Sequence, residues 1–148
     1  MSSNQRIVSV VDDDISTVTM FYEALRENFQ EISVFSFTDP VKAFEHFISN
    51  KSEYFPIVSD LRMPRLNGLE LLKKIKTANP KVRTLLMTAF EIDDPLFEEY
   101  RKEGIINDLL QKPIRLNDLR SIVEKHLDMY KKLKNKKLSK PDGSWMTS

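Results

Sequence analysis

Five polar side chains in this sequence could do chemistry together, namely Asp12, Asp13, Asp60, Thr88 and Lys112. Each lies at or just after the end of a short, mostly apolar run, so each is expected at the carboxyl end of a β-strand. Open α/β sheets bind ligands at that edge. A lone aspartate there would more often begin a loop or cap a helix, but five convergent side chains predict a site.

The residue types indicate which chemistry this site could perform. Three carboxylates repel one another unless a cation joins them, and an oxygen-only ligand set with room for water suits Mg²⁺. Thr88 would add a hydroxyl donor, and Lys112 would add a positive charge opposite the metal. Together these groups would make Asp60 an acceptor for a phosphoryl group.

The elements that must position these residues alternate between strand and helix. Strands are expected at residues 7–11, 32–37, 82–87 and 105–110, and in the run that ends at Asp60. An amphipathic helix is expected after each strand, the third over residues 68–78 and the fifth continuing to Leu133. Parallel neighbours need right-handed crossovers. The chain is therefore predicted to be α/β, a doubly wound five-stranded parallel sheet of order 2-1-3-4-5 covered by helices.

Cap residues and prolines predict where the helices begin. Asp39-Pro40 and Asp94-Pro95 each combine an aspartate cap with a proline at the first helical position, where no hydrogen bond is lost. Asp14 or Ser16 is expected to cap the first helix, and Asn117 the last.

Composition excludes several other kinds of site. The 148 residues include no cysteine, so neither a disulfide nor a thiolate site can form. His46 and His126 lie far apart on expected helices, and we interpret both as ordinary helix residues. The amino terminus lacks a signal-peptide pattern and no apolar run could span a bilayer, so a cytoplasmic location is expected.

Charge is concentrated at the carboxyl end of the chain. Residues 129–148 hold six lysines and one aspartate, which leaves residues 1–128 at about −4. The chain after Lys134, including Trp145, shows no periodicity, so residues 131–148 are expected to form a basic, flexible tail after a domain over residues 5–130. Because such lysine runs are usually solvated helix ends, neither nucleic acid nor a membrane is expected as a partner.

Four spaced motifs carry a family resemblance. Val11-Asp12-Asp13-Asp14, Ser59-Asp60-Leu61-Arg62-Met63-Pro64 with Gly68, Met87-Thr88-Ala89 and Lys112-Pro113 occur in the order found in receiver domains of two-component response regulators. Any one motif alone would be weak, but their joint occurrence over about residues 5–130 is specific. The resemblance implies a flavodoxin-like, CheY-like fold.

The resemblance also implies a role for each site residue. Asp60 would be the phosphoacceptor, taking the group from a phosphohistidine of a sensor histidine kinase or phosphotransfer protein. Lys112 would pair with the phosphoryl oxygens, Thr88 would hydrogen-bond to them, and the Lys112-Pro113 bond would be cis. The Mg²⁺ ligands would be Asp12, Asp13, Asp60 and the backbone carbonyl of Arg62.

The length of 148 residues predicts a single domain. The resemblance implies that this domain is a regulator rather than an enzyme, assisting only its own phosphorylation and dephosphorylation. It would signal by phosphorylation-dependent binding of a protein target at the face of the fourth helix, fifth strand and fifth helix. Two positions depart from the family pattern. Leu109 stands where the family usually has an aromatic residue, and Gly104 lies one residue farther from Lys112 than is common.

Two alternatives remain open from the sequence. The chain could be a pseudo-receiver that docks proteins independently of phosphorylation, which the departure at Leu109 allows. It could also be a phosphatase resembling the dehalogenase-like enzymes. Those enzymes need a second aspartate two residues after the nucleophile, where this chain has Arg62.

Overall fold

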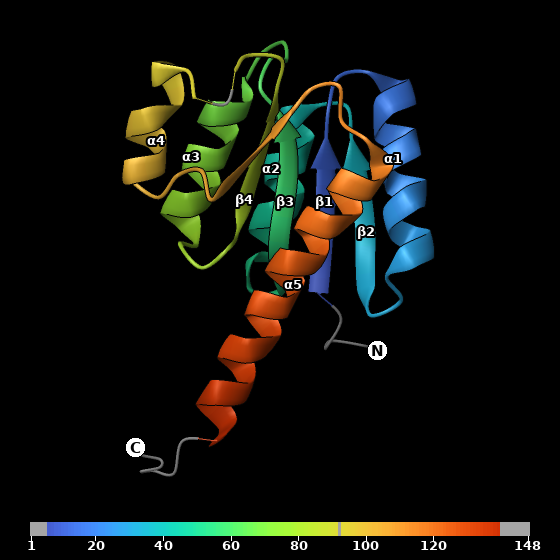
Figure 1. Ribbon diagram of the computed structural model, residues 1–148, viewed down its shortest axis with the longest axis vertical. Helices are drawn as coiled ribbons and strands as arrows, with labels where there is room; N and C mark the ends of the chain where they lie inside the picture. Colours follow the sequence, from blue (N-terminus) through green and yellow to red (C-terminus); the bar gives the residue numbers. More distant parts are fainter. Residues whose placement is uncertain (1–5, 92, 140–148) are drawn as a thin grey trace.

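A computed structural model describes residues 6–91 and 93–139, with side chains described through Lys132. Its five strands form one parallel sheet of order β2-β1-β3-β4-β5 (Figure 1). This confirms the predicted architecture. The strands are β1 Arg6–Val11, β2 Ile32–Phe37, β3 Tyr54–Asp60, β4 Thr84–Thr88 and β5 Asp108–Gln111.

Helices cover both faces of the sheet. α1 and α5 pack on one face, and α2, α3 and α4 pack on the other (Figure 1). Two short 3₁₀ turns, η1 Lys51–Glu53 and η2 Pro95–Phe97, precede β3 and α4. The helices are α1 Ile15–Asn28, α2 Pro40–Ser49, α3 Gly68–Ala78, α4 Glu98–Lys102 and α5 Leu116–Ser139.

The core consists of two apolar layers divided by the sheet. Alternate residues of β1 enter opposite layers, Val8 and Val10 the layer of α1 and α5, and Ile7 and Val11 the layer of α2 and α3. All seven residues of β3 are buried, as expected for the central strand of a doubly wound sheet. This rigid centre carries Asp60 at its carboxyl end.

The structure settles the helix caps. Asp14 caps α1, and its side chain accepts the amide hydrogen of Ser16. The expected Asn117 cap is wrong, because Asn117 lies in the first turn of α5 and accepts a hydrogen bond from the Arg120 side chain. That turn is closed earlier, by the Leu119 amide donating to the carbonyl of Arg115.

The fifth strand begins later than predicted. Ile105 and Ile106 are buried as expected, but both amides donate to the carbonyl of Tyr100, at 2.9 and 3.3 Å. Gly104, with φ +78°, turns the chain so that these residues close the end of α4 instead of joining the sheet. β4 also starts two residues late, because the amide of Val82 closes a turn onto the carbonyl of Asn79.

α5 is longer than its apolar spacing predicts. The ring of Tyr130 packs 4.8 Å from that of Phe55 and 4.6 Å from the guanidinium carbon of Arg6, and α5 continues past this anchor away from the sheet (Figure 1). The predicted boundary at residue 130 thus falls inside α5. The predictions for the chain beyond Ser139, including Trp145, concern residues outside the described part. No helix in the described ranges is both long and apolar enough to cross a membrane.

Candidate functional site

The register of β1 and β3 brings the acidic residues together. Val11 pairs with Ser59, so Asp12 and Asp60 leave the sheet side by side. One carboxylate oxygen from each of Asp12, Asp13 and Asp60 lies within 4.8 Å of the others. Asp12 and Asp60 are buried and Asp13 is exposed, so a cation at this cluster could bind protein oxygens on one side and water on the other.

Lys112 reaches the same cluster from the end of β5. Its Nζ lies 2.7 Å from Oδ1 of Asp60 and 3.6 Å from Oδ2 of Asp12. Its backbone amide donates to the carbonyl of Thr88, and the following bond to Pro113 is cis, as the family resemblance implied. Burial disfavours the ammonium, but the hydrogen bond and charge of Asp60 outweigh burial and hold the pKa of Lys112 above its usual value.

The two carboxylate oxygens of Asp12 differ in their surroundings. Its Oδ1 accepts the amide hydrogen of Asp14, but its buried Oδ2 has no hydrogen-bond partner among the described residues. Burial, reinforced by the charge of Asp60 and opposed by the Asp14 amide, raises the pKa of Asp12. One ammonium therefore pairs with two of the three clustered carboxylates, and the remaining negative charge favours a further cation.

Thr88 ends β4 on the same edge. Asp60 pairs with Met87 in the sheet, and Thr88 is the next residue of β4 after Met87. Thr88 is buried, and its Oγ1 accepts the amide hydrogen of Phe90 at 2.9 Å. The five residues predicted from the sequence therefore all lie at the carboxyl edge of the sheet.

Two contacts near this edge were not predicted. The guanidinium carbon of Arg62 lies 4.9 Å from the ring centroid of Phe90, a cation–π contact between the loops that follow β3 and β4. Arg65 has φ 76° and donates to Asp39, the α2 cap, at 2.7 Å. Arg62 and Phe90 lie two residues after Asp60 and Thr88 in the sequence. Nothing in the sequence, however, indicates that Arg62 contacts Phe90 or that Arg65 contacts Asp39.

Neither histidine lies at this edge. His46 hydrogen-bonds through Nδ1 to the hydroxyl of Tyr54, the first residue of β3. His126 is buried between Arg83 and Asp108, at the amino ends of β4 and β5. His126 therefore belongs to the opposite end of the sheet, and His46 packs beside β2 against the rings of Phe35 and Phe37.

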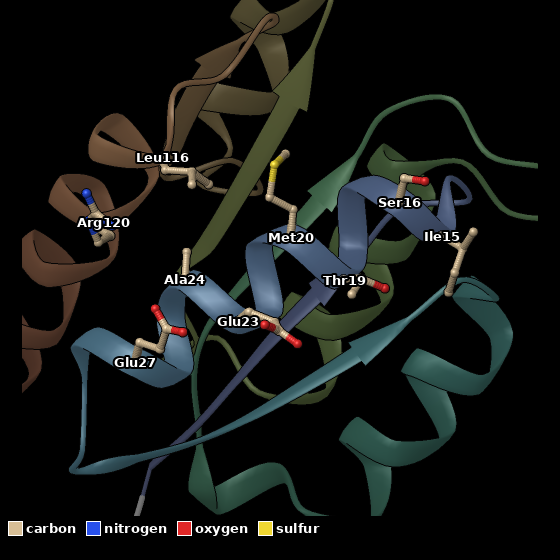
Figure 2. Close-up of a pocket in the computed structure, with 9 residues that line it drawn as sticks. All are labelled: Ile15, Ser16, Thr19, Met20, Glu23, Ala24, Glu27, Leu116 and Arg120. Atoms are coloured by element: carbon tan, nitrogen blue, oxygen red, sulfur yellow. The ribbon is translucent and has the colours of Figure 1, made fainter.

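An open groove between α1 and α5 is a separate feature of the surface (Figure 2). Apolar Ile15, Met20 and Leu116 line it together with charged Glu23 and Arg120. It includes none of the five site residues, so the chemistry predicted from the sequence belongs to the carboxyl edge of the sheet.

Comparison with known proteins agrees with this geometry. The model of the response regulator receiver domain family matches residues 8–124. The transcriptional regulatory protein ZraR of Klebsiella oxytoca is 33% identical over 120 residues, which are 80% of this chain and 26% of that protein. The DNA-binding transcriptional regulator NtrC of Escherichia coli K12 is 31% identical over 124 residues, 84% of this chain and 25% of that protein. The chain thus spans about a quarter of the length of these relatives.

Solved structures show the same fold. A response regulator receiver domain protein from Clostridium thermocellum aligns with TM-score 0.75 at 20% identity, covering 86% of this chain and 98% of its own. The receiver domain of the Francisella response regulator 1452 aligns with TM-score 0.70 at 25% identity, covering 85% and 99%. Given the family match, the strand order and the acidic edge, this chain belongs to the receiver domain family of two-component response regulators.

Proposed function

We propose that Asp60 accepts a phosphoryl group from the phosphohistidine of a sensor histidine kinase or phosphotransfer protein. The observation that carries this proposal is the buried Asp60 carboxylate with the Lys112 ammonium 2.7 Å from its Oδ1. An ammonium in that place pairs with the carboxylate before transfer and with phosphoryl oxygens afterwards. Two further carboxylates beside Asp60 complete the arrangement.

The transfer replaces one bond to phosphorus with another. A carboxylate oxygen of Asp60 forms the new O–P bond while the P–N bond of the phosphohistidine breaks, and the electron pair of that bond stays on the imidazole nitrogen. Thr88 then donates its hydroxyl hydrogen to a phosphoryl oxygen. Water later attacks phosphorus, the O–P bond to Asp60 breaks, and inorganic phosphate leaves as the carboxylate is restored. The chain would thus assist its own phosphorylation and dephosphorylation without being an enzyme for a separate substrate.

The acidic cluster fits Mg²⁺ as the cofactor. Its ligands are all oxygens, and Oδ2 of Asp12, which has no hydrogen-bond partner among the described residues, supplies a buried acceptor that a cation would satisfy. Asp12, Asp13, Asp60 and the backbone carbonyl of Arg62 would hold the ion. When bound, Mg²⁺ neutralises charge on the transferring oxygens.

Output is proposed to pass through a protein target at the face formed by α4, β5 and α5. Phosphorylation would shift the population between two arrangements of that face, and the target would bind one of them more tightly. The transcriptional activities of ZraR and NtrC belong to proteins about three times as long as this chain, so they are not assigned to it. A cytoplasmic location, and partners other than nucleic acid, remain predictions from the sequence.

The proposal is tested by treating the chain with a small acyl phosphate and Mg²⁺ and measuring intact mass. The wild type should gain one phosphoryl group, and EDTA should prevent the gain. Asp60→Ala should gain none, while Asp14→Ala, outside the carboxylate cluster, should behave as wild type. Modification that persists in Asp60→Ala rejects the assignment.

A pseudo-receiver that docks proteins without phosphorylation is the second candidate, favoured by Leu109 at a usually aromatic place. It predicts no Mg²⁺-dependent change in the NMR signals around Asp60. A saturable Mg²⁺ titration of those signals would eliminate it in favour of the phosphoacceptor.

A further inference from the structure

The hydroxyl of Thr88 is already engaged by the backbone. Thr88 is 1% exposed, and its Oγ1 accepts the amide hydrogen of Phe90 at 2.9 Å. A β-branched side chain has few staggered positions for its oxygen, so turning the hydroxyl toward Asp60 is a discrete rotation. That rotation carries Oγ1 away from the Phe90 amide, which then loses its acceptor.

The ring of Phe90 connects this amide to two neighbouring segments. It lies 4.9 Å from the guanidinium carbon of Arg62 in the loop after β3. Its centroid is also 6.4 Å from that of Phe97, which is completely buried and ends the 3₁₀ turn leading into α4. The Phe90 ring therefore connects the residues after Thr88 to the turn that leads into α4.

Position 109 does not offer an equivalent connection. Leu109 pairs with Leu86 in the sheet and packs, half-buried, against the same apolar layer as Phe90. It has neither an aromatic ring to interact with a cation nor a hydroxyl group to form a hydrogen bond. The aromatic residue linked to Thr88 by a hydrogen bond is Phe90, two residues along the chain.

We propose that phosphorylation of Asp60 is relayed to α4 through Phe90. This rests on the proposed phosphoacceptor role of Asp60. In the unmodified state Thr88 holds the Phe90 amide, and the ring stays on Arg62 and against Phe97. When Thr88 turns to the phosphoryl oxygens, the Phe90 amide is released, the ring shifts, and the packing of Phe97 at the start of α4 changes. The two arrangements form a bistable element whose populations the phosphoryl group biases.

The test uses the full ¹⁵N-labelled chain and beryllofluoride with Mg²⁺ as a phosphoryl mimic, read by amide NMR shifts. In the wild type, signals at Asp60, at Phe90 and across α4 should move together. Phe90→Leu should keep the response at Asp60 and lose most of the response in α4. Leu109→Met, a matched aliphatic change, should keep both.

Thr88 variants separate the hydroxyl from the bulk of the side chain. Thr88→Val loses a hydrogen bond to the mimic, so it should bind the mimic more weakly; at saturating beryllofluoride its Asp60 signal should still move while most of the α4 shift is lost, and Thr88→Ser should keep both. If Phe90→Leu retains the full α4 response, or if the Phe90 amide stays still while Asp60 responds, the relay is overturned and the phosphoacceptor role stands. If no signal near Asp60 moves in the wild type, both proposals fail.

Discussion

A Cβ atom on Gly68 would lie 2.2 Å from the backbone carbonyl oxygen of Asp60. That distance is far inside van der Waals contact, and the obstacle is backbone that cannot rotate away. The amide of Gly68 also donates to the carbonyl of Leu61 at 2.8 Å, which holds α3 close against the end of β3. The absence of a side chain at residue 68 is therefore a condition for the position of Asp60.

We predict that Gly68→Ala lowers the free energy of unfolding by about 3 kcal/mol or more, because overpacking forces the backbone to move. Gly104→Ala is a matched control, since Gly104 has φ +78° with open space around it. Its cost should be about 1 kcal/mol, from backbone conformation alone. Urea denaturation of both variants checks the difference, and equal costs would contradict the steric explanation.

The buried His126 predicts a loss of stability in mild acid. Its Nδ1 accepts from Nε of Arg83, so the ring hydrogen is on Nε2 and points to Asp108. Burial lowers the pKa of His126 below 6.5. The hydrogen bond to Asp108 acts in the opposite direction, and the charge of Arg83 lowers the pKa further. A proton on Nδ1 would also face the Arg83 donor.

The direction in which stability changes with pH follows from the difference in proton binding between the folded and unfolded states. Above pH 6.5 His126 is mostly neutral in both the folded and the unfolded state, so protonation of His126 does not reduce stability there. As pH falls from 6.5 toward the lower folded pKa, the unfolded state binds the proton first and stability drops, by up to about 1.4 kcal/mol per pH unit.

Comparing urea denaturation across this range in the wild type and His126→Gln isolates the effect. His46, whose pKa burial also lowers, adds to the slope and is removed separately by His46→Gln. A slope unchanged in His126→Gln would contradict the assignment. Burial alone would raise the pKa of Asp108, but the hydrogen bonds and charges of Lys125 and His126 lower it below 3.8. The stability that Asp108 contributes is therefore lost only at more acid pH, as pH falls below 3.8.

Removing one charge from the acidic cluster should stabilise the metal-free protein. Asp12→Asn relieves the repulsion among Asp12, Asp13 and Asp60, and its side-chain oxygen can still accept the Asp14 amide. We expect a gain of about 1–2 kcal/mol in EDTA, as Coulomb energies at such distances allow.

The stabilisation that Mg²⁺ adds should shrink in the same variant, because bound ligand stabilises the folded state by mass action. Asp14→Asn is the control, since Asp14 is exposed outside the cluster and asparagine caps helices equally well. Denaturation with and without Mg²⁺ measures both effects. A less stable Asp12→Asn in EDTA would show that repulsion does not dominate the cluster.

The Arg62–Phe90 contact is expected to limit the access of water to the phosphoryl group. Phe90→Ala removes the ring and frees the guanidinium, so the phosphorylated form should decay about two- to five-fold faster, as the loss of a cation–π contact of about 0.5–1 kcal/mol implies. Phe90→Tyr keeps the ring and should decay like the wild type. Loss of the phosphoryl group is followed by intact mass after the donor is removed, and an unchanged or longer lifetime in Phe90→Ala contradicts the account.

The sequence predicts best where local pattern and tertiary position agree. α3 spans Gly68–Ala78 as predicted, because an asparagine cap, an apolar stripe and a following proline all define it locally. The site residues are located correctly because each follows an apolar run, and parallel strands bring such ends to one edge.

The prediction fails where a tertiary contact overrides the pattern. Ile105 and Ile106 have the composition of a strand, yet the carbonyl of Tyr100 takes both their amides at the end of α4. The sequence does not reveal that Oδ2 of Asp12 lacks a hydrogen-bond partner, because this depends on its burial and on its 3.6 Å distance from Nζ of Lys112.

The most direct test is to locate the phosphoryl group chemically. The wild-type chain is phosphorylated with Mg²⁺ and reduced with borohydride, which converts an aspartyl phosphate to homoserine, and its peptides are sequenced by mass spectrometry. Homoserine is expected at residue 60 alone, and none is expected when EDTA replaces Mg²⁺. Homoserine at Asp12 or Asp13 instead, or its absence from residue 60 in the Mg²⁺-treated protein, would contradict the proposed role of Asp60.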